Sequence, residues 1–231
     1  SDKEKDYLRV LKEKMVDGVI YMSSSLEEET LDIINELDLK TVLVETKDKE
    51  GRLPSVYIDN IEATYEATKH LLDKGIKNIA FIGVDKSSAN AWGDRYIGYE
   101  KALNEAGIPV DEDLVYFEGL KVKSGYVASE KFLASGKNFD GIICASDEIA
   151  MGAINGLREK GVNTPEDVSV IGFNDNVVAS YFYPKLTTVK QPSYDMGSVA
   201  MRMLIKILNN KPLEEAEFIL NHELIERESC K

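Results

Sequence analysis

The chain has 231 residues, enough for one large domain or two small ones with a sizeable core. Its composition, with 43% hydrophobic and 30% charged residues, is typical of a soluble globular protein. The formal net charge of −13 argues against direct binding to the phosphate backbone of nucleic acid, because lysine and arginine make that contact.

Residues that build metal and cofactor sites are scarce. The chain has two histidines and two cysteines without a C-x-x-C spacing, so we expect neither a zinc site nor a structural disulfide. It has no G-x-x-x-x-G-K-[ST] or G-x-G-x-x-G motif, so we expect no nucleotide cofactor. No apolar run has the length of a membrane span and no signal-like segment opens the chain. Together with the free cysteines, this predicts a cytoplasmic protein.

Strands and helices alternate along the predicted chain. Helices are expected at 7–15 and 26–37, with strands at 16–23 and 40–46. Further strands are expected at 56–60, 78–84, 113–119, 139–145 and 168–173, and the helices between them at 61–74, 95–106, 125–135 and 147–160. Each of these later helices ends at a glycine, which can take the left-handed conformation that reverses the chain. The alternation predicts parallel βαβ units and an α/β fold.

The C-terminal region has two further patterns. A helix is predicted at 193–208. Its apolar stripe is formed by Met196, Val199, Ala200, Met203, Leu204, Ile207 and Leu208. The tail at 217–229 alternates like an antiparallel edge strand or a hairpin.

Polar residues recur at the carboxyl ends of the predicted strands. They are Ser23 to Ser25, Glu45, Asp59, Asn60, Ser146, Asp147, Asn174 and Asp175. Asp, Asn and Ser favour helix caps and turns, which is one explanation. Open α/β sheets also bind ligands beyond the carboxyl ends of their strands, which is the other. The recurrence favours a ligand cleft, and its many hydrogen-bonding groups suit a polyhydroxylated ligand.

Several long motifs occur in the order found in one protein family. They are VDGVI at 16–20, VYIDN at 56–60, ATKHLLDKGIKNIAFIG at 67–83, DRYIGYEKALNEAGI at 94–108, ASDEIAMGAINGLREKGVNTPEDVSVIGFND at 145–175 and YPKLTTVKQPSYDMGSVAMRMLIKIL at 183–208. Over essentially its whole length the chain resembles repressors of the lac repressor and galactose repressor (LacI/GalR) family, most closely those of the catabolite control protein A type.

The resemblance implies a two-subdomain, periplasmic-binding-protein-like fold of type I, each subdomain being a parallel sheet flanked by helices. The N-terminal subdomain would contain residues 1–60 and 191–210, and the C-terminal one 61–188 and 213–231. The family's DNA-binding helix-turn-helix head is absent from this sequence, as is the first strand-helix-strand of the N-terminal subdomain. The missing head accounts for the acidic charge.

The resemblance also implies ligand-binding residues. Arg95 matches an arginine that enters the cleft in sugar-responsive relatives, where it can bind adjacent hydroxyls or a carboxylate. The alternative for Arg95 is a solvated arginine at a helix start. Glu45 lies where relatives carry a ligand-facing Asp, and its alternative is an ordinary loop charge.

Other positions depart from the family pattern. Asp147 matches the family's ND-x-x-A-x-G motif, with Ser146 replacing Asn, and is either a ligand-facing residue or the cap of the next helix. Asn174 replaces a common Asp and keeps an acceptor while adding donors. Lys121 stands at a position that is aromatic in several relatives, and Trp92 either substitutes for that ring or packs in a loop. The lost negative charge at Asn174 and the positive charge at Lys121 predict a phosphorylated or carboxylated sugar, with a neutral sugar as the alternative.

The helix at 193–208 suggests a second site. Tyr194, Asp195, Ser198 and Arg202 lie off its apolar stripe. This segment resembles the one through which catabolite control protein A binds the serine-phosphorylated phosphocarrier protein of sugar uptake, and Arg202 would meet the phosphate. The alternative is a plain solvated face.

Taken together, these features predict the effector-binding and dimerisation domain of a LacI-family repressor, which senses a sugar or sugar derivative and controls DNA binding allosterically. The alternative is an extracytoplasmic sugar-binding protein of a transport system. The sequence shows no nucleophile–base pair, so we do not expect an enzyme.

Overall fold

The computed structural model describes residues 2–23, 25–88 and 90–231, and Ser24 of the predicted strand-end set lies outside this part. The chain divides into two compact units. Unit 1 comprises the chain up to Ile58 together with Pro192–Asn221, and unit 2 comprises Asp59–Gln191 and His222–Lys231. Within the described residues, no helix is long and apolar enough to span a membrane.

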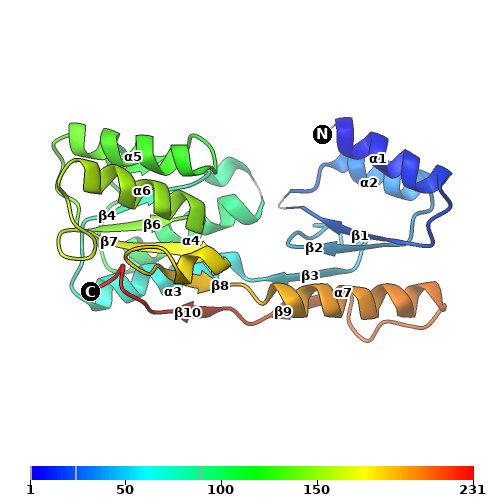
Figure 1. The fold of residues 1–231 in the computed structure, drawn as a ribbon. Coiled ribbons are helices and arrows are strands. Elements are labelled where there is room, and N and C mark those ends of the chain that lie inside the picture. Colours follow the sequence, from blue (N-terminus) through cyan, green and yellow to red (C-terminus); the bar gives the residue numbers. More distant parts are fainter. Residues whose placement is uncertain (1, 24, 89) are drawn as a thin grey trace. The chain divides into compact units, whose positions relative to one another are not determined.

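Unit 1 is built on a parallel sheet. Its strands, in order, are β1 (Val19–Met22), β2 (Thr41–Val44), β3 (Ser55–Ile58) and β9 (Glu217–Leu220). Helix α7 (Ser193–Leu208) lies along one face, and α1 (Asp2–Glu13) and α2 (Glu28–Glu36) lie along the other (Figure 1). The predicted stripe of α7 packs on β2 and β3, through Met196, Val199, Ala200, Met203 and Leu204 against Val42, Val44 and Val56. Leu208, at the end of the stripe, is exposed.

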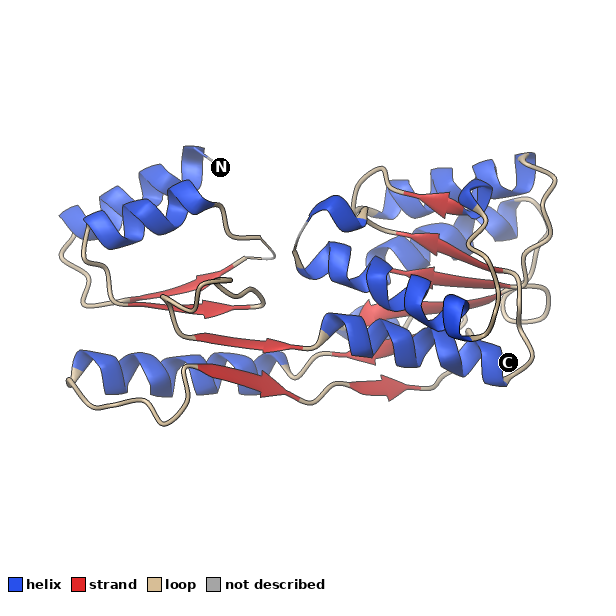
Figure 2. Ribbon diagram, turned by 180° about the vertical axis from the view of Figure 1, so that it is seen from behind, coloured by secondary structure: helices blue, strands red, loops and turns tan. Residues whose placement is uncertain are grey.

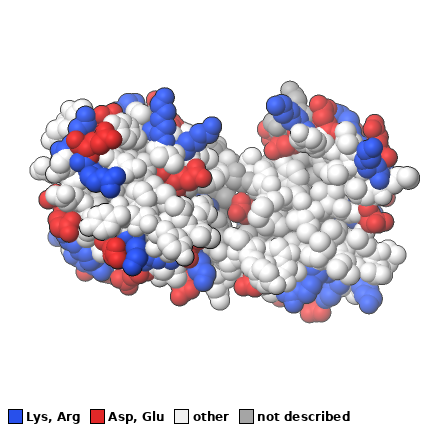
Figure 3. All heavy atoms as spheres, viewed as in Figure 1, with Lys and Arg blue, Asp and Glu red and all other residues white. Residues whose placement is uncertain are grey.

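Strand β1 lies at one edge of this sheet. Its residues are half-buried or exposed, whereas β2 and β3 are buried throughout. On the face seen in Figure 3, an uncharged area lies over the strands of unit 1, and charged side chains of both signs gather on the helices around it. No continuous basic stripe crosses this face, in keeping with the acidic net charge.

Unit 2 contains the second sheet. Its strands, in order, are β10 (Glu223–Ile225), β8 (Thr187–Lys190), β7 (Ser169–Asn174), β6 (Gly141–Cys144), β4 (Ile79–Ile82) and β5 (Val115–Tyr116). All pairs are parallel except β10 with β8. The helices α3 (Asn60–Asp73) and α4 (Ala91–Glu105) pack as one pair, and α5 (Val122–Ala134) and α6 (Asp147–Glu159) as another. The two pairs cover opposite faces of the sheet (Figures 1 and 2).

Glycines allow the close approach of α5 and α6. A Cβ at Gly152 would lie 1.9 Å from the carbonyl oxygen of Val122, and one at Gly125 would lie 1.9 Å from that of Ile149. Both distances are far below van der Waals contact, so only glycine fits at these two positions. The backbones of the two helices are therefore in close contact, and Ser146 and Asp147 lie at the start of α6.

The C-terminal tail was predicted to form an antiparallel edge strand or a hairpin, and it forms two separate edge strands. Strand β9 pairs in parallel with β3 in unit 1, whereas β10 pairs antiparallel with β8 in unit 2. The two strands are thus edge strands of different sheets, and only β10 has the predicted antiparallel pairing. Residues 213–221, which we expected in the C-terminal subdomain, therefore belong to unit 1.

Candidate functional site

Helix starts and strand ends converge at the carboxyl edge of the sheet in unit 2. Strands β4, β6 and β7 run parallel, so their carboxyl ends meet at one edge. Helices α3, α4 and α6 begin there, and the dipoles of their N-termini favour acceptor groups, some of which the capping residues Asp59, Asn90 and Ser146 already supply. This edge holds most of the residues predicted to bind a ligand.

Arg95 is the central cation of this edge. It lies on α4, and its side chain is buried, with the residue only 3% exposed. The guanidinium carbon is 3.6 Å from the ring centroid of Phe173 and 4.4 Å from that of Trp92. Its Nε donates to Asn60 Oδ1 at 2.9 Å and its Nη1 to the carbonyl oxygen of Ala145 at 2.5 Å. The alternative of a solvated arginine is therefore wrong.

These contacts hold the guanidinium plane in one orientation. The two aromatic rings attract the cation, an interaction that strengthens when water is excluded. The fork geometry of arginine lets a held guanidinium recognise planar carboxylates, phosphates or adjacent hydroxyls. Arg95 thus joins α4 to the start of α3 and to the ends of β6 and β7.

Trp92 lies in the first turn of α4 and not in a loop. The helix begins four residues earlier than predicted because Asn90 caps it, accepting from the backbone N–H groups of Trp92 and Gly93 at 3.0 and 3.1 Å. The loop-packing alternative for Trp92 is therefore wrong, and its half-buried indole covers Arg95.

Ser146, and not Asp147, takes the capping role at the start of α6. Ser146 is the cap of α6, and its hydroxyl accepts from the N–H of Ile149 at 3.3 Å. Asp147 is fully buried; its carboxylate accepts from Thr188 Oγ1 at 2.5 Å and from the N–H of Asn176 at 2.7 Å. Capping by Asp147 is therefore wrong. Burial raises its pKa to about 6, although the two hydrogen bonds oppose the shift.

Asn174 ends β7 with an unusual backbone. Its φ is +108°, and that of the next residue, Asp175, is +55°. Left-handed conformations at non-glycine residues are strained and concentrate at functional sites. Asp175 is held by Arg227, whose Nη2 donates to it at 2.7 Å. Asn174 Oδ1 accepts from Gln191 Nε2 at 2.7 Å.

Some members of this site were not assigned from the sequence. Phe173 was interpreted as core of the strand, although its ring packs on Arg95. Asn60 appeared only among strand-end residues, and Gln191 was not singled out at all. Gln191 follows strand β8 (Thr187–Lys190), which was not predicted, so the strand-end signal that identified Asn174 did not point to it.

Two predicted ligand residues are separate from this cluster. Glu45 belongs to unit 1, where it follows β2 with a φ of +66°. Lys121 is exposed at the start of α5, after β5. Strands β6 and β4 lie between β7 and β5, so β5, which precedes Lys121, is three strand spacings, about 14 Å, from the strand of Asn174.

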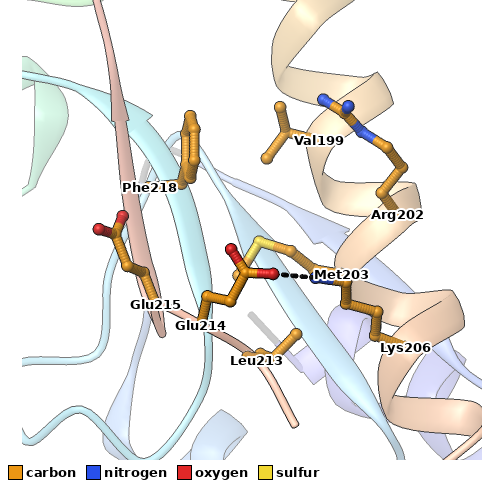
Figure 4. Close-up of a pocket in the computed structure, with 8 residues that line it drawn as sticks. All are labelled: Val199, Arg202, Met203, Lys206, Leu213, Glu214, Glu215 and Phe218. Atoms are coloured by element: carbon orange, nitrogen blue, oxygen red, sulfur yellow. Dashed lines mark hydrogen bonds and ion pairs between the residues drawn. The ribbon is translucent and has the colours of Figure 1, made fainter. Parts of the chain in front are cut away.

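The predicted partner residues lie on the outer face of α7. Tyr194 is 87% exposed, and Asp195 and Arg202 are also exposed. Arg202 borders a pocket of about 460 Å³ between α7 and the segment leading into β9 (Figure 4). Apolar Val199, Met203, Leu213 and Phe218 line it together with the charged side chains of Lys206, Glu214 and Glu215. Lys206 is paired with Glu214 at 3.1 Å.

No group of three or more His, Cys, Asp or Glu residues in the described part of the chain could hold a metal ion. The charged groups at the edge of unit 2 are instead bound to one another or to the backbone, as with Asp175–Arg227 and Asp147–Asn176. This arrangement suits the binding of an organic ligand by hydrogen bonds.

Known proteins resemble the whole chain. Residues 68–230 match the family described as periplasmic binding protein-like domain. The HTH-type transcriptional regulator RegA of Clostridium saccharobutylicum is 68% identical over 228 residues, which cover 99% of this chain and 69% of that protein. The crystal structure of the transcription regulator CcpA of Lactococcus lactis matches with a TM-score of 0.91 and 36% identity, over 100% of this chain and 84% of that one. The chain belongs to the LacI family of transcription regulators.

A further structure, described as a complex of the transcriptional regulator CelR with cellobiose, matches this LacI-family chain with a TM-score of 0.91 and 30% identity, over 99% of this chain and 70% of that one. The predicted family and the type I periplasmic-binding-protein-like fold are thus confirmed. The transport-protein alternative is not favoured, because these relatives are regulators of transcription.

Proposed function

We propose that the carboxyl edge of the sheet in unit 2 binds a sugar or sugar derivative, and that this effector controls the DNA affinity of the regulator. The observation that carries the proposal is the buried guanidinium of Arg95, which lies over the rings of both Trp92 and Phe173 near the start of α4. The structural relative solved with cellobiose supports a carbohydrate as the ligand class.

The chemistry of the edge suits a polyol. Sugars carry many hydroxyl groups that both donate and accept, and the edge offers an arginine, amides and helix N-termini within one small area. Trp92 adds an aromatic surface of the kind that packs against a sugar ring. Ser146 and Asp147 would contribute from the start of α6, with Asp147 also bracing the site through Thr188.

The charge of the site supports an anionic effector. Within the cluster Arg95 is cationic and Asn174 is neutral, and Lys121 is a further cation of unit 2 that lies apart from the cluster. Carboxylate and phosphate oxygens form charge-assisted hydrogen bonds with such groups, so we favour a sugar phosphate or sugar acid over a neutral sugar.

The same proposal includes its macromolecular partners. Operator DNA would be bound only through helix-turn-helix heads outside this sequence, because the chain carries a net charge of −13.

A homodimer is supported by exposed apolar side chains that follow β7, namely Val177, Tyr181 and Tyr183, which are 80%, 82% and 78% exposed. The outer face of α7 would bind a serine-phosphorylated phosphocarrier protein through Arg202. No enzymatic activity is proposed, and we expect the protein to act in the cytoplasm.

Calorimetry tests the effector site. Wild type, Arg95→Ala and Lys121→Ala would be titrated with glucose, glucose 6-phosphate and gluconate after a thermal-shift screen of sugars, sugar phosphates and sugar acids. We expect binding that requires Arg95, with the anionic ligands preferred and weakened by Lys121→Ala. Arg158→Ala is the matched control, because Arg158 is exposed and donates to Asn155 on its own helix. Unchanged binding in a folded Arg95→Ala variant would contradict the proposal.

A further inference from the structure

Gln191 follows β8 and lies beside the end of β7. The two strands are parallel neighbours in which Asn174 is aligned with Lys190, so Gln191 comes one residue beyond the last aligned pair. Its side chain is buried, with the residue only 8% exposed, and its Nε2 donates to Asn174 Oδ1 at 2.7 Å.

This hydrogen bond orients the amide of Asn174. An amide group has an acceptor end and a donor end, and they lie on opposite sides of the side chain. Gln191 takes the oxygen, so the NH₂ group of Asn174 is turned away from β8. The backbone of Asn174, with φ at +108°, is itself in a restricted conformation.

The orientation decides which chemistry Asn174 can recognise. Arg95, whose guanidinium packs on the adjacent Phe173, has only donors. With its NH₂ group turned outward, Asn174 adds two more donors to the same edge. A ligand group rich in acceptors, such as a carboxylate or phosphate, then matches the edge better than a hydroxyl, which must also donate.

We propose that Gln191 determines the specificity of the effector site by positioning the amide of Asn174, so that the site selects carboxylate or phosphate oxygens. This inference rests on the proposed function. Gln191 is a positioning residue that acts through Asn174 and is not itself required to touch the effector.

The substitution Gln191→Glu tests the inference by reversing the orientation of the Asn174 side-chain amide. Glu at position 191 has only acceptors, so in Gln191→Glu the NH₂ group of Asn174 must turn to donate to it and Oδ1 turns outward. Calorimetry would compare glucose 6-phosphate with glucose. We expect the wild type to prefer the phosphate, and Gln191→Glu to lose that preference by on the order of tenfold, the effect of one charge-assisted hydrogen bond.

A charge-matched control is needed because the variant adds a negative charge. Lys190→Gln changes the charge by the same amount at the adjacent residue, whose exposed side chain pairs only weakly with Glu223, at 4.0 Å. If the two variants lower the preference equally, charge alone explains the effect and the inference is overturned. In an Asn174→Ala background, Gln191→Glu should have no more effect than Lys190→Gln, since the amide that it turns is gone.

Nuclear magnetic resonance tests the orientation without a ligand. In the wild type, the side-chain amide protons of Gln191 should exchange slowly and those of Asn174 quickly; in Gln191→Glu those of Asn174 should become protected. Slow exchange of the side-chain amide protons of Asn174 in the wild type would overturn the inference, even if glucose 6-phosphate binds. Failure of both sugars to bind any folded variant would overturn the proposed function instead, and with it the role of Gln191.

Discussion

Thr188 Oγ1 donates a hydrogen bond of 2.5 Å to the fully buried carboxylate of Asp147, which ties the first turn of α6 to β8. The same carboxylate accepts from the N–H of Asn176, so it also holds the segment after β7. A Cβ at Gly172 would lie 2.4 Å from Asp147 Oδ1, so the carboxylate fits only because β7 has a glycine there. The acid is therefore a brace beneath the candidate effector site.

The raised pKa of Asp147 predicts an unusual dependence of stability on pH. The folded protein holds this proton up to about pH 6, whereas the unfolded chain releases it near 3.8. The folded state thus binds more protons between these values, so this group's contribution to the free energy of unfolding is largest below 3.8 and falls as pH rises to about 6. The loss amounts to about 3 kcal/mol at most, from two pKa units.

Asp147→Asn isolates this effect. Asparagine can accept from Asn176 and donate to Thr188, whose hydroxyl can reverse its role, so the brace is kept without the charge. Urea unfolding from pH 4 to 8 should show the variant gaining stability relative to the wild type as pH rises. Parallel pH profiles for the two proteins would contradict the prediction.

His70 should act in the opposite direction. It lies on α3, 3.5 Å from the carboxylate of Glu226, and its Nε2 is buried without a hydrogen bond to any described residue. Burial lowers its pKa below 6.5, against the opposing effect of Glu226 and with a smaller lowering by Lys74. The stability that neutral His70 provides is therefore present above pH 6.5 and is lost as pH falls through its lower, folded-state pKa.

His70→Gln tests this prediction, because glutamine is similar in size and does not titrate. The variant should lose less stability than the wild type between pH 7 and 5. His222→Gln is the control: His222 also pairs with a glutamate of the same region, Glu66, at 2.9 Å. If the pH profile of stability is unchanged in His70→Gln but altered in His222→Gln, the prediction for His70 is wrong.

The sequence was sufficient to predict the alternating elements and the polar carboxyl edge, because periodicity and turn residues are local signals. Helix 193–208 was predicted with its observed bounds. The two strands of the C-terminal tail were not predicted separately, because β9 and β10 form one alternating segment in the sequence. Their partner strands, β3 and β8, are determined by tertiary pairing, which the sequence pattern does not show. The sequence also did not show whether Ser146 or Asp147 caps α6, because Ser and Asp are equally favourable N-cap residues.

The site could be predicted only in part for a related reason. Asn174 follows a strand in the sequence, which marks it as an edge residue, whereas Arg95 lies within a helix and was assigned only from the family resemblance. What they contact depends on segments far away: Asn60 lies 35 residues before Arg95, and Gln191 lies 17 after Asn174. Strand periodicity gave Phe173 a purely structural role, yet its ring also supports the guanidinium of Arg95.

The exposed apolar group at Val177, Tyr181 and Tyr183 predicts a concentration-dependent dimer. Tyr181→Glu would place a charge among these side chains, and burying it on association would be costly. Sedimentation should show the wild type as a dimer at tens of micromolar and the variant shifted toward monomer. Tyr7→Glu is a control, since Tyr7 is 69% exposed on α1 in the other unit. An unchanged dimer in Tyr181→Glu would exclude this surface as the interface.

Arg202 tests the proposed partner surface on α7. Its guanidinium borders the pocket with Val199, Met203 and Phe218, and Lys206 beside it is already paired with Glu214 (Figure 4). A phosphoserine carries close to two negative charges at neutral pH and can form paired hydrogen bonds with arginine. Arg202→Ala should therefore weaken binding of the serine-phosphorylated phosphocarrier protein about tenfold or more, measured by calorimetry.

Arg202→Lys should recover only part of the loss, because lysine keeps the charge without the planar fork. The unphosphorylated carrier is the matched control for the phosphate, and equal binding of both forms to the wild type would leave Arg202 as an ordinary solvated residue.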